Sequence, residues 1–424
     1  MYRTPMNHTL IPPFPQIFTY SDSSSLSPVA VVQDFAVIMI VAAVMILITY
    51  KFKQPTVLGY IAAGMIIGPY TPPFPLLQNI ETVNVFAELG IIMLLFVIGT
   101  DFPIQKLRSV GRISIIVASA ESIGTLLLTL IVGQHLGFSF FDSIFIALAM
   151  SITSTVITVR ILEELGMLKD KSSTLLLGIS IVEDTIAISA LAVIQSISVS
   201  MVSTGNEVTN LDTISQLLIS IGVVAAFIGG ILILGSRYLP KVVDKIGNTH
   251  DYALFLMVIL GLAVGLSLGA SLLGLSVATG AFFAGVLVAE SKSANMARVI
   301  TTPIRDVFAA VFFISIGALM DISLIPIFIV PAVLLILASF GSKFFIVAAL
   351  LNRAKYDNIT SLRTALGMAS AKGELSLVVA KGGQDVGVIT SAVLPILGVV
   401  TIVTTFMTPY VLKFGTKLTN FLKT

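Results

Sequence analysis

The chain of 424 residues contains no cysteine and little charge. The lack of cysteine excludes disulfide bonds, thiolate nucleophiles and cysteine-ligated metals. Only 11% of the residues are charged, against about 25% in ordinary soluble domains, while 56% are hydrophobic and the mean hydropathy is +1.04. The composition therefore excludes a water-soluble globule. The net charge of +2, with no cluster of Lys and Arg, indicates no nucleic-acid partner.

Apolar runs of about 20 residues, the length that crosses a bilayer, recur from end to end. They predict an all-α polytopic membrane protein with about 13 spans. The spans are expected at 31–50, 55–70, 84–100, 111–133, 140–162, 172–200, 214–238, 251–267, 271–290, 302–320, 323–351, 360–382 and 387–412. The break between the eighth and ninth spans is expected at Ser267–Ser271, and the polar residues 1–30 are expected to form a disordered extracellular arm.

Basic residues mark every second connection between the spans. The loops expected to be basic are 51–53, 101–112, 160–171, 237–245, 292–305, 353–363 and the tail at 416–424, whereas 71–83, 134–142, 201–213 and 321–322 lack Lys and Arg. Basic loops stay in the cytoplasm. The N-terminus is therefore expected outside and the C-terminus inside.

Ionisable residues deep in a span are costly and survive when they are paired, hydrated or functional. The sequence places seven of them there: Glu88, Glu121, Glu183, Asp184, Lys343, Lys372 and Glu374. The adjacent acids Glu183 and Asp184 are the most informative. One reading is a structural salt bridge between helices. The other is a cation and proton site, because a buried carboxylate holds its proton more tightly and a metal ion then competes with that proton near neutral pH.

Two spans carry residues that weaken a helix. The run Ser151–Thr158 is rich in hydroxyl and β-branched residues, which predicts an interruption at Thr153–Thr155. The run Gly367–Leu375 is rich in small residues around Gly373 and predicts a second interruption near 370–374. Interrupted spans in both halves favour an inverted repeat with the site between them. Packing by small hydroxyl residues and neutralisation of helix ends by Lys372 and Glu374 remain alternatives, and Glu121 is a conjectured partner of Lys372.

A series of short motifs runs through about 350 residues in a fixed order. They are Gln54-Pro55, Leu58-Gly59-Tyr60, Gly64, Gly68-Pro69, Glu88-Leu89-Gly90, Leu94-Leu95-Phe96, Gly99, Ser154-Thr155, Glu183-Asp184, Phe282-Phe283-Ala284-Gly285, Phe312-Phe313, Gly317 and Lys372-Gly373-Glu374. By these motifs the chain resembles the monovalent cation:proton antiporter superfamily, and most closely its second branch of bacterial and archaeal Na+ or K+/H+ exchangers.

The resemblance implies two domains and an elevator-like cycle. A dimerisation domain would comprise 31–100 and 251–320, a core domain with two crossing broken helices would comprise 111–200 and 323–415, and 214–238 would be a linker helix. It also implies a site. Asp184, Glu183, Thr153, Ser154 and Thr155 would bind the ion and proton, with Asp184, Glu183 and Ser154 as metal ligands. Lys343, Lys372 and Glu374 would compensate charge, with Lys343 paired to Glu183.

This chain departs from the family pattern at the acid pair. Electrogenic members usually have Asp-Asp, electroneutral ones often Asn-Asp and potassium-efflux relatives Gln-Asp, whereas this chain has Glu183-Asp184. Two acids with Lys343 favour the electrogenic class. No fused nucleotide-sensing domain is expected, because no Gly-rich dinucleotide loop follows the last span.

The expected function is exchange of Na+, with Li+ or K+ as alternatives, for protons. The protein is expected to be a homodimer in a prokaryotic inner membrane, with no cofactor and no enzymatic activity. An electroneutral exchanger or an ion channel are the alternatives to electrogenic exchange. An intramembrane enzyme is disfavoured because the three histidines, His8, His135 and His250, lie in the arm or at loops. An organic-solute symporter is disfavoured because no Arg or aromatic cluster surrounds the acid pair.

Overall fold

The computed structural model describes most of the chain between residues 28 and 421. Within that stretch it leaves out 53, 71–75, 78–79, 101–110, 156, 159–161, 163–166, 168–169, 204–221, 223–225, 228, 250, 274–276 and 321–324. The predicted arm at 1–30 therefore lies almost entirely outside the described residues, as do the start of the linker helix at 214–238 and parts of several predicted loops.

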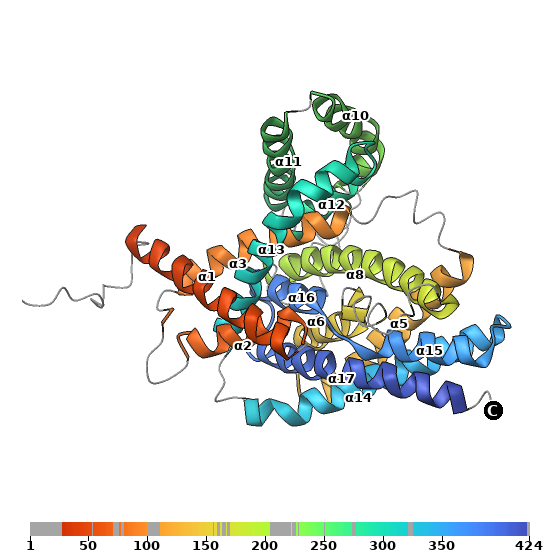
Figure 1. Cartoon of the computed structure of the whole chain (residues 1–424). Helices are drawn as coiled ribbons and strands as arrows, with labels where there is room; N and C mark the ends of the chain where they lie inside the picture. The colour runs from red at the N-terminus through yellow and green to blue at the C-terminus, as the bar shows by residue number, and fades with distance from the viewer. Residues whose placement is uncertain are drawn as a thin grey trace, which may run out of the picture.

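All regular structure in the described residues is helical. The bounds are α1 Pro28–Lys51, α2 Thr56–Ile67, α3 Ile80–Thr100, α5 Arg112–His135, α6 Phe140–Ser151, α8 Lys171–Ser203, the π-helix η1 Ile231–Gly235, α10 Ser236–Gly247, α11 Tyr252–Leu272, α12 Val277–Ala289, α13 Ala294–Ala318, α14 Ile325–Arg353, α15 Asn358–Ser370, α16 Glu374–Asp385 and α17 Val393–Phe421 (Figure 1). Among the described residues, eight helices are long and apolar enough to cross a membrane. The chain is an all-α polytopic membrane protein, as the composition predicts.

The predicted break at Ser267–Ser271 is displaced. Helix α11 continues through this segment to Leu272, and α12 begins only at Val277. The Ser267 hydroxyl donates to the Ala263 carbonyl one turn earlier, which lets the serine stay inside the helix. The two spans exist as predicted, but the break lies several residues later.

Several of the predicted basic segments are helical instead. Residues 237–245 belong to α10, most of 292–305 to α13, 358–363 to α15, and 416–421 of the predicted tail to α17. Helix α10 is amphipathic, because it buries Val243 while its cationic side chains are exposed. Asp244 on its inner side accepts a hydrogen bond of 3.0 Å from the Ser293 backbone NH. The basic residues therefore lie along α10 and in the first half of α13 rather than in loops.

The helices pack in two sets. The first contains α1, α2, α3, α11, α12 and α13, and the second contains α5, α6, α8, α14, α15, α16 and α17. In Figure 1, α10, α11 and α12 project at the top, while α14, α15 and α17 lie together at the bottom right. Residues 31–100 and 251–320 contribute the first set, and residues 111–200 and 323–415 contribute most of the second. The part that either set plays in dimerisation or transport remains a prediction.

Motif glycines allow the close contacts in the first set. A Cβ atom built on Gly99 would lie 2.2 Å from the Phe282 carbonyl oxygen, and one on Gly285 would lie 2.0 Å from the Phe96 carbonyl oxygen. At the contact between α2 and α13, Gly64 and Gly317 approach each other's backbone in the same way. Small residues at helix crossings let backbones touch, which is the usual basis of helix association in a membrane.

A polar contact joins the two sets near the ends of α16 and α3. The Lys381 Nζ atom lies 2.6 Å from the Asp385 carboxylate on its own helix and 3.3 Å from Asn84 Oδ1 on α3. Lys381 is buried, so its charge is compensated within this contact rather than by water.

Candidate ion-binding site

Two extended segments cross at the centre of the second set. Helix α6 ends at Ser151 and α15 ends at Ser370, and each is followed by a short extended segment before the span continues. The Ser154 backbone NH donates to the Ala371 carbonyl oxygen at 2.9 Å, so the segments meet through a backbone hydrogen bond. Both predicted interruptions are therefore present.

The crossing requires glycine at position 373. A Cβ atom on Gly373 would lie 2.4 Å from both the Cβ and the Oγ of Ser154, well inside van der Waals contact. Any side chain larger than hydrogen would push the two segments apart. The small-residue run that predicted the second interruption thus has a steric reason.

Each broken span supplies donors to the helix end of the other. The Met150 carbonyl at the end of α6 accepts from Lys372 Nζ at 2.6 Å. The neighbouring Ala149 carbonyl accepts from Ser376 at 2.8 Å. In return, the Met368 carbonyl near the end of α15 accepts from the Thr153 hydroxyl at 2.7 Å. Terminal helix carbonyls have no partner within their own helix, and hydrocarbon offers none, so these contacts hold the breaks open.

A third helix also contributes to the first break. Ser339 on α14 donates to the Met150 carbonyl at 2.8 Å, one helical turn before Lys343. Position 339 therefore lies on the same face of α14 as Lys343. Ser339 was not predicted to take part in the site, although its spacing of four residues from Lys343 was a signal.

Glu183 of α8 is bound tightly at the crossing. Its side chain is fully buried, and Lys343 Nζ of α14 lies 2.8 Å from its Oε2 atom. The Thr153 backbone NH donates to its other oxygen, and Lys343 also donates to the Thr153 hydroxyl at 2.8 Å. The pairing implied by the resemblance is therefore present in the geometry, and the break at Thr153 is part of it.

Asp184 follows Glu183 on α8, projects about 100° away from it, and contacts Thr155 after the first break. The Thr155 hydroxyl donates to its Oδ2 atom at 3.2 Å, and the aspartate is 4% exposed. Ser154 precedes this half-span: its Oγ accepts weakly from the Ile157 NH at 3.4 Å, and its carbonyl accepts from Thr158. Thr153 thus donates hydrogen bonds to Glu183, and Thr155 donates one to Asp184. The two adjacent acids therefore contact the residues just before and just after Ser154 in the first break.

The conjectured pairing of Glu121 with Lys372 is wrong. Glu121 on α5 lies with its Oε2 atom 3.1 Å from Lys343 Nζ, and both side chains are fully buried. Lys372 instead donates to the Met150 carbonyl. Depth along the membrane placed Glu121 correctly near the site, but depth does not say towards which neighbour a helix face is turned.

Two other predicted positions lie differently. Glu374 begins α16, but its side chain falls outside the described part of the structure. Glu88 is exposed on α3 in the first set, away from the crossing. Across the described residues, no group of three or more His, Asp or Glu side chains could hold a metal ion.

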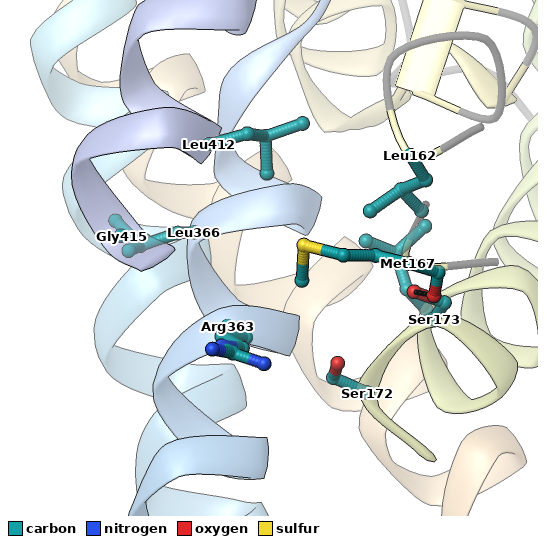
Figure 2. A pocket seen from close by; sticks show the side chains of 9 residues that line it. Leu162, Met167, Ser172, Ser173, Arg363, Leu366, Leu412 and Gly415 are labelled. Carbon is teal, nitrogen blue, oxygen red and sulfur yellow. Dashed lines mark hydrogen bonds between the residues drawn. The ribbon is translucent and has the colours of Figure 1, made fainter. Parts of the chain in front are cut away.

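A small pocket lies near the crossing but does not contain the acids. It is lined by apolar side chains of α15 and α17, by Ser172 and Ser173 of α8, and by Arg363, which pairs with Asp170 at 3.3 Å. Figure 2 shows Leu412 and Leu162 on opposite sides, with the Met167 side chain between them. The space holds no more than about one water molecule.

Comparisons with known proteins agree on one class. The family model described as "Sodium/hydrogen exchanger, transmembrane" matches residues 37–417, so the chain belongs to this family of cation/proton antiporters. YbaL of Escherichia coli K12, a protein whose name designates it a cation/proton antiporter, is 29% identical over 364 residues. That match covers 84% of this chain and 63% of YbaL, so the chain spans less than two thirds of that relative.

Solved structures share the fold. The sodium proton antiporter MjNhaP1 of Methanocaldococcus jannaschii at pH 8 is similar with a TM-score of 0.64 and 17% identity, over 91% of this chain and 95% of that one. A second structure of MjNhaP1, an electron-microscopy map, is similar with a TM-score of 0.60 and 18% identity.

Proposed function

We propose that the chain exchanges a monovalent cation, Na+ in the first place, for protons, with Asp184 as the shared binding site. The observation that carries the proposal is the position of the Asp184 carboxylate, held by Thr155 where two broken spans cross. Family membership supports the class of activity. The choice of Na+ follows the family description, with Li+ and K+ as the other candidates.

Competition between a proton and a cation explains obligatory exchange. A buried carboxylate accepts either a proton or a metal ion, and each neutralises the charge that hydrocarbon disfavours. Hydroxyl and carbonyl oxygens at an unwound segment are the ligands that transporters use for small cations. Asp184, Ser154 and Thr155 would supply such oxygens, and Glu183 would join them when it is released from Lys343.

The two buried acids with Lys343 support electrogenic exchange of two protons for each cation. One net charge then moves inward per cycle, worth about 2.3 kcal/mol per 100 mV, or roughly a 45-fold additional cation gradient. Electroneutral exchange of one proton for one cation is the alternative, and it would use only the pH difference.

The packing of the helices supports an elevator-like cycle. The second set contains the whole crossing, whereas the first set contacts it through few helices. The second set would move against the first, and the first would form a homodimer. The chain would lie in a prokaryotic inner membrane with the N-terminus outside and the C-terminus in the cytoplasm.

The first prediction concerns Asp184→Asn. In proteoliposomes containing the purified chain, this variant should abolish Na+-driven proton flux, because Asn neither binds a proton nor neutralises a cation. The matched control is Asp306→Asn, which removes an exposed acid of α13 whose partner is the adjacent Arg305, and it should keep wild-type flux. Wild-type flux in Asp184→Asn would remove this residue from the mechanism, and single-channel currents would favour a channel instead.

A further inference from the structure

Glu121 of α5 is a buried acid whose carboxyl group has few donors around it. The side chain has no exposed surface. Its Oε2 atom lies 3.1 Å from Lys343 Nζ but accepts no hydrogen bond from any residue that the structure describes. Its Oε1 atom has the Ser122 hydroxyl at 3.5 Å, longer than an ordinary hydrogen bond between oxygens. A buried carboxylate with so few donors is costly, whereas the neutral acid form costs much less.

Glu183 of α8 is held in the opposite way. Its side chain is also fully buried, but Lys343 Nζ donates to its Oε2 atom at 2.8 Å. The Thr153 backbone NH donates to its Oε1 atom, and the Thr153 hydroxyl lies 3.2 Å from Oε2. Donors on both carboxylate oxygens stabilise the ionised form. Glu183 therefore keeps its charge while it is paired with Lys343.

The two acids compete for one ammonium group. The Oε2 atoms of Glu121 and Glu183 both lie within 3.1 Å of Lys343 Nζ, so two carboxylates here would be close neighbours of like charge. When two carboxylates share a site of low dielectric constant, one of them retains a proton. The donors favour Glu183 as the charged member, which leaves Glu121 as the member that can take up a proton.

Three helices pack against α5 and supply the charged groups around this acid. Helix α14 presents Lys343, and α8 presents Glu183 with Asp184 next to it in the chain. Helix α6 carries Asp142, which lies in its first turn and accepts a hydrogen bond from a backbone NH. Lys372, at the second break, donates to a backbone carbonyl of the first break. In the described part of the chain, Lys343 is thus the cation within ion-pair distance of the acid, so the ionisation of the acid depends on whether Lys343 has another partner.

We propose that Glu121 is the second proton-binding residue of the exchange cycle: it takes up a proton when Glu183 pairs with Lys343 and loses that proton when Glu183 is released. The inference rests on the proposed exchange in its electrogenic form, in which Asp184 binds the first proton. The pairing in the structure is that of the proton-loaded state, since Glu183 is bound to Lys343 and the Glu121 Oε2 atom accepts no hydrogen bond from the described residues.

Release of Glu183 links the cation to the second proton. When a cation binds Asp184, Glu183 leaves Lys343 to supply a further oxygen ligand, and the ammonium group would be buried without a carboxylate, which is strongly unfavourable. Glu121 then releases its proton to water and pairs with Lys343 instead. When the cation leaves, Glu183 returns to Lys343, and Glu121 and Asp184 each take one proton from water. Two protons are therefore exchanged for one cation, and one net charge moves.

The test observes the protonated carboxyl groups directly by infrared spectroscopy. The purified chain in detergent is compared before and after Na+ is added, because a carboxylic acid and a carboxylate absorb at different wavenumbers. Glutamate labelled with 13C separates the glutamate band from the aspartate band. On binding Na+, wild type should lose one glutamate band and one aspartate band of the acid form. Glu121→Gln should lose the aspartate band alone.

Two further variants complete the infrared test. Glu121→Asp retains an acid if the amide folds poorly, and it should replace the labelled glutamate band by a second aspartate band. Thr129→Val on α5 is the control, because the Thr129 hydroxyl is buried and bonds within its own helix, and it should keep both wild-type bands. If Glu121 only positioned Lys343, it would stay ionised and its substitution would leave the labelled band in place. A labelled band that persists in either Glu121 variant, or that is absent from wild type, would overturn the inference.

The number of protons separates failure of the inference from failure of the proposed function. Protons released on addition of Na+ are counted with a pH indicator, and two per bound Na+ are expected for wild type and one for Glu121→Gln. In proteoliposomes, Glu121→Gln should also lose the response of Na+-driven proton flux to an imposed membrane potential. One proton per Na+ in wild type would overturn the inference and leave cation/proton exchange standing. Absence of wild-type exchange with any alkali cation would show that the proposed function itself is wrong.

Discussion

At the scale of single residues, buried acids and buried bases lie together where the two broken spans cross. Glu121 and Glu183 are each within 3.1 Å of Lys343 Nζ, and Lys372 lies at the adjacent break on the Met150 carbonyl. Two acids and two bases at this depth explain why the chain tolerates ionisable groups that are individually costly in hydrocarbon. Asp184, which accepts a hydrogen bond from Thr155, is a third buried acid at the crossing and the proposed site of the exchanged cation and proton.

A prediction at the scale of residues concerns Asp357, the N-cap residue of α15 in the turn after α14. Its Oδ2 atom accepts from the Thr360 NH at 2.9 Å, and this backbone hydrogen bond lowers the pKa of the exposed carboxyl below its usual value. The stabilisation is therefore fully present above the ordinary aspartate pKa of about 3.9 and is lost as the pH falls through the lower pKa of the folded state.

Amide hydrogen exchange at the start of α15 measures this cap. Asp357→Ala should weaken the first turn by about 1 kcal/mol at pH 7, and exchange there should accelerate accordingly. Asp357→Asn is the matched control, because Asn caps as well as Asp but does not titrate. The explanation fails if Asp357→Asn exchanges as fast as Asp357→Ala at pH 7.

At the scale of elements, the crossing depends on Gly373. Gly373→Ala should destabilise the protein by about 1–3 kcal/mol, as overpacking of a filled interior does, because its Cβ atom would lie 2.4 Å from Ser154. It should also impair transport by separating the breaks. Thermal unfolding in detergent and Na+-driven proton flux measure the two effects.

A glycine in open space provides the control for that substitution. A Cβ atom on Gly261 of α11 would have no neighbour within 4 Å. Gly261→Ala should therefore leave stability unchanged or raise it by up to about 1 kcal/mol, the difference in helix propensity. Equal losses in the two variants would show that the crossing is not the cause.

The elements also show how far the sequence predicts the structure. Hydropathy predicted the spans and hydroxyl-rich and small-residue runs predicted both breaks, because these features depend on local composition. The predicted position of the break after α11 was wrong, because the Ser267 hydroxyl bonds within its own helix and does not end it. The predicted partner of Glu121 was also wrong, because that partner depends on how α5 is rotated against α14, which no local sequence pattern encodes.

At the scale of the whole molecule, the lack of cysteine allows the proposed orientation to be tested directly. Single cysteines introduced into these 424 residues can be labelled selectively, because the 424 residues contain none. His135, the last residue of α5, and Asn248, which follows α10, are both exposed. With the N-terminus outside, an impermeant maleimide should label His135→Cys in intact cells and Asn248→Cys only after permeabilisation. The reverse pattern would invert the orientation.

The donors exchanged between the two broken spans impose an order on biosynthesis. Thr153 and its acceptor Met368 are 215 positions apart, and Met150 and Lys372 are 222 apart. At about 5–20 residues per second, a ribosome needs roughly 10–45 s to cover that distance. During this time the first break has been synthesised but its hydrogen-bond partners on the second broken span have not. Lipid cannot provide hydrogen bonds in their place. We therefore expect the first break to stay hydrated or shielded during synthesis, and the crossing with its candidate ion-binding site to assemble only after Lys372 has been synthesised.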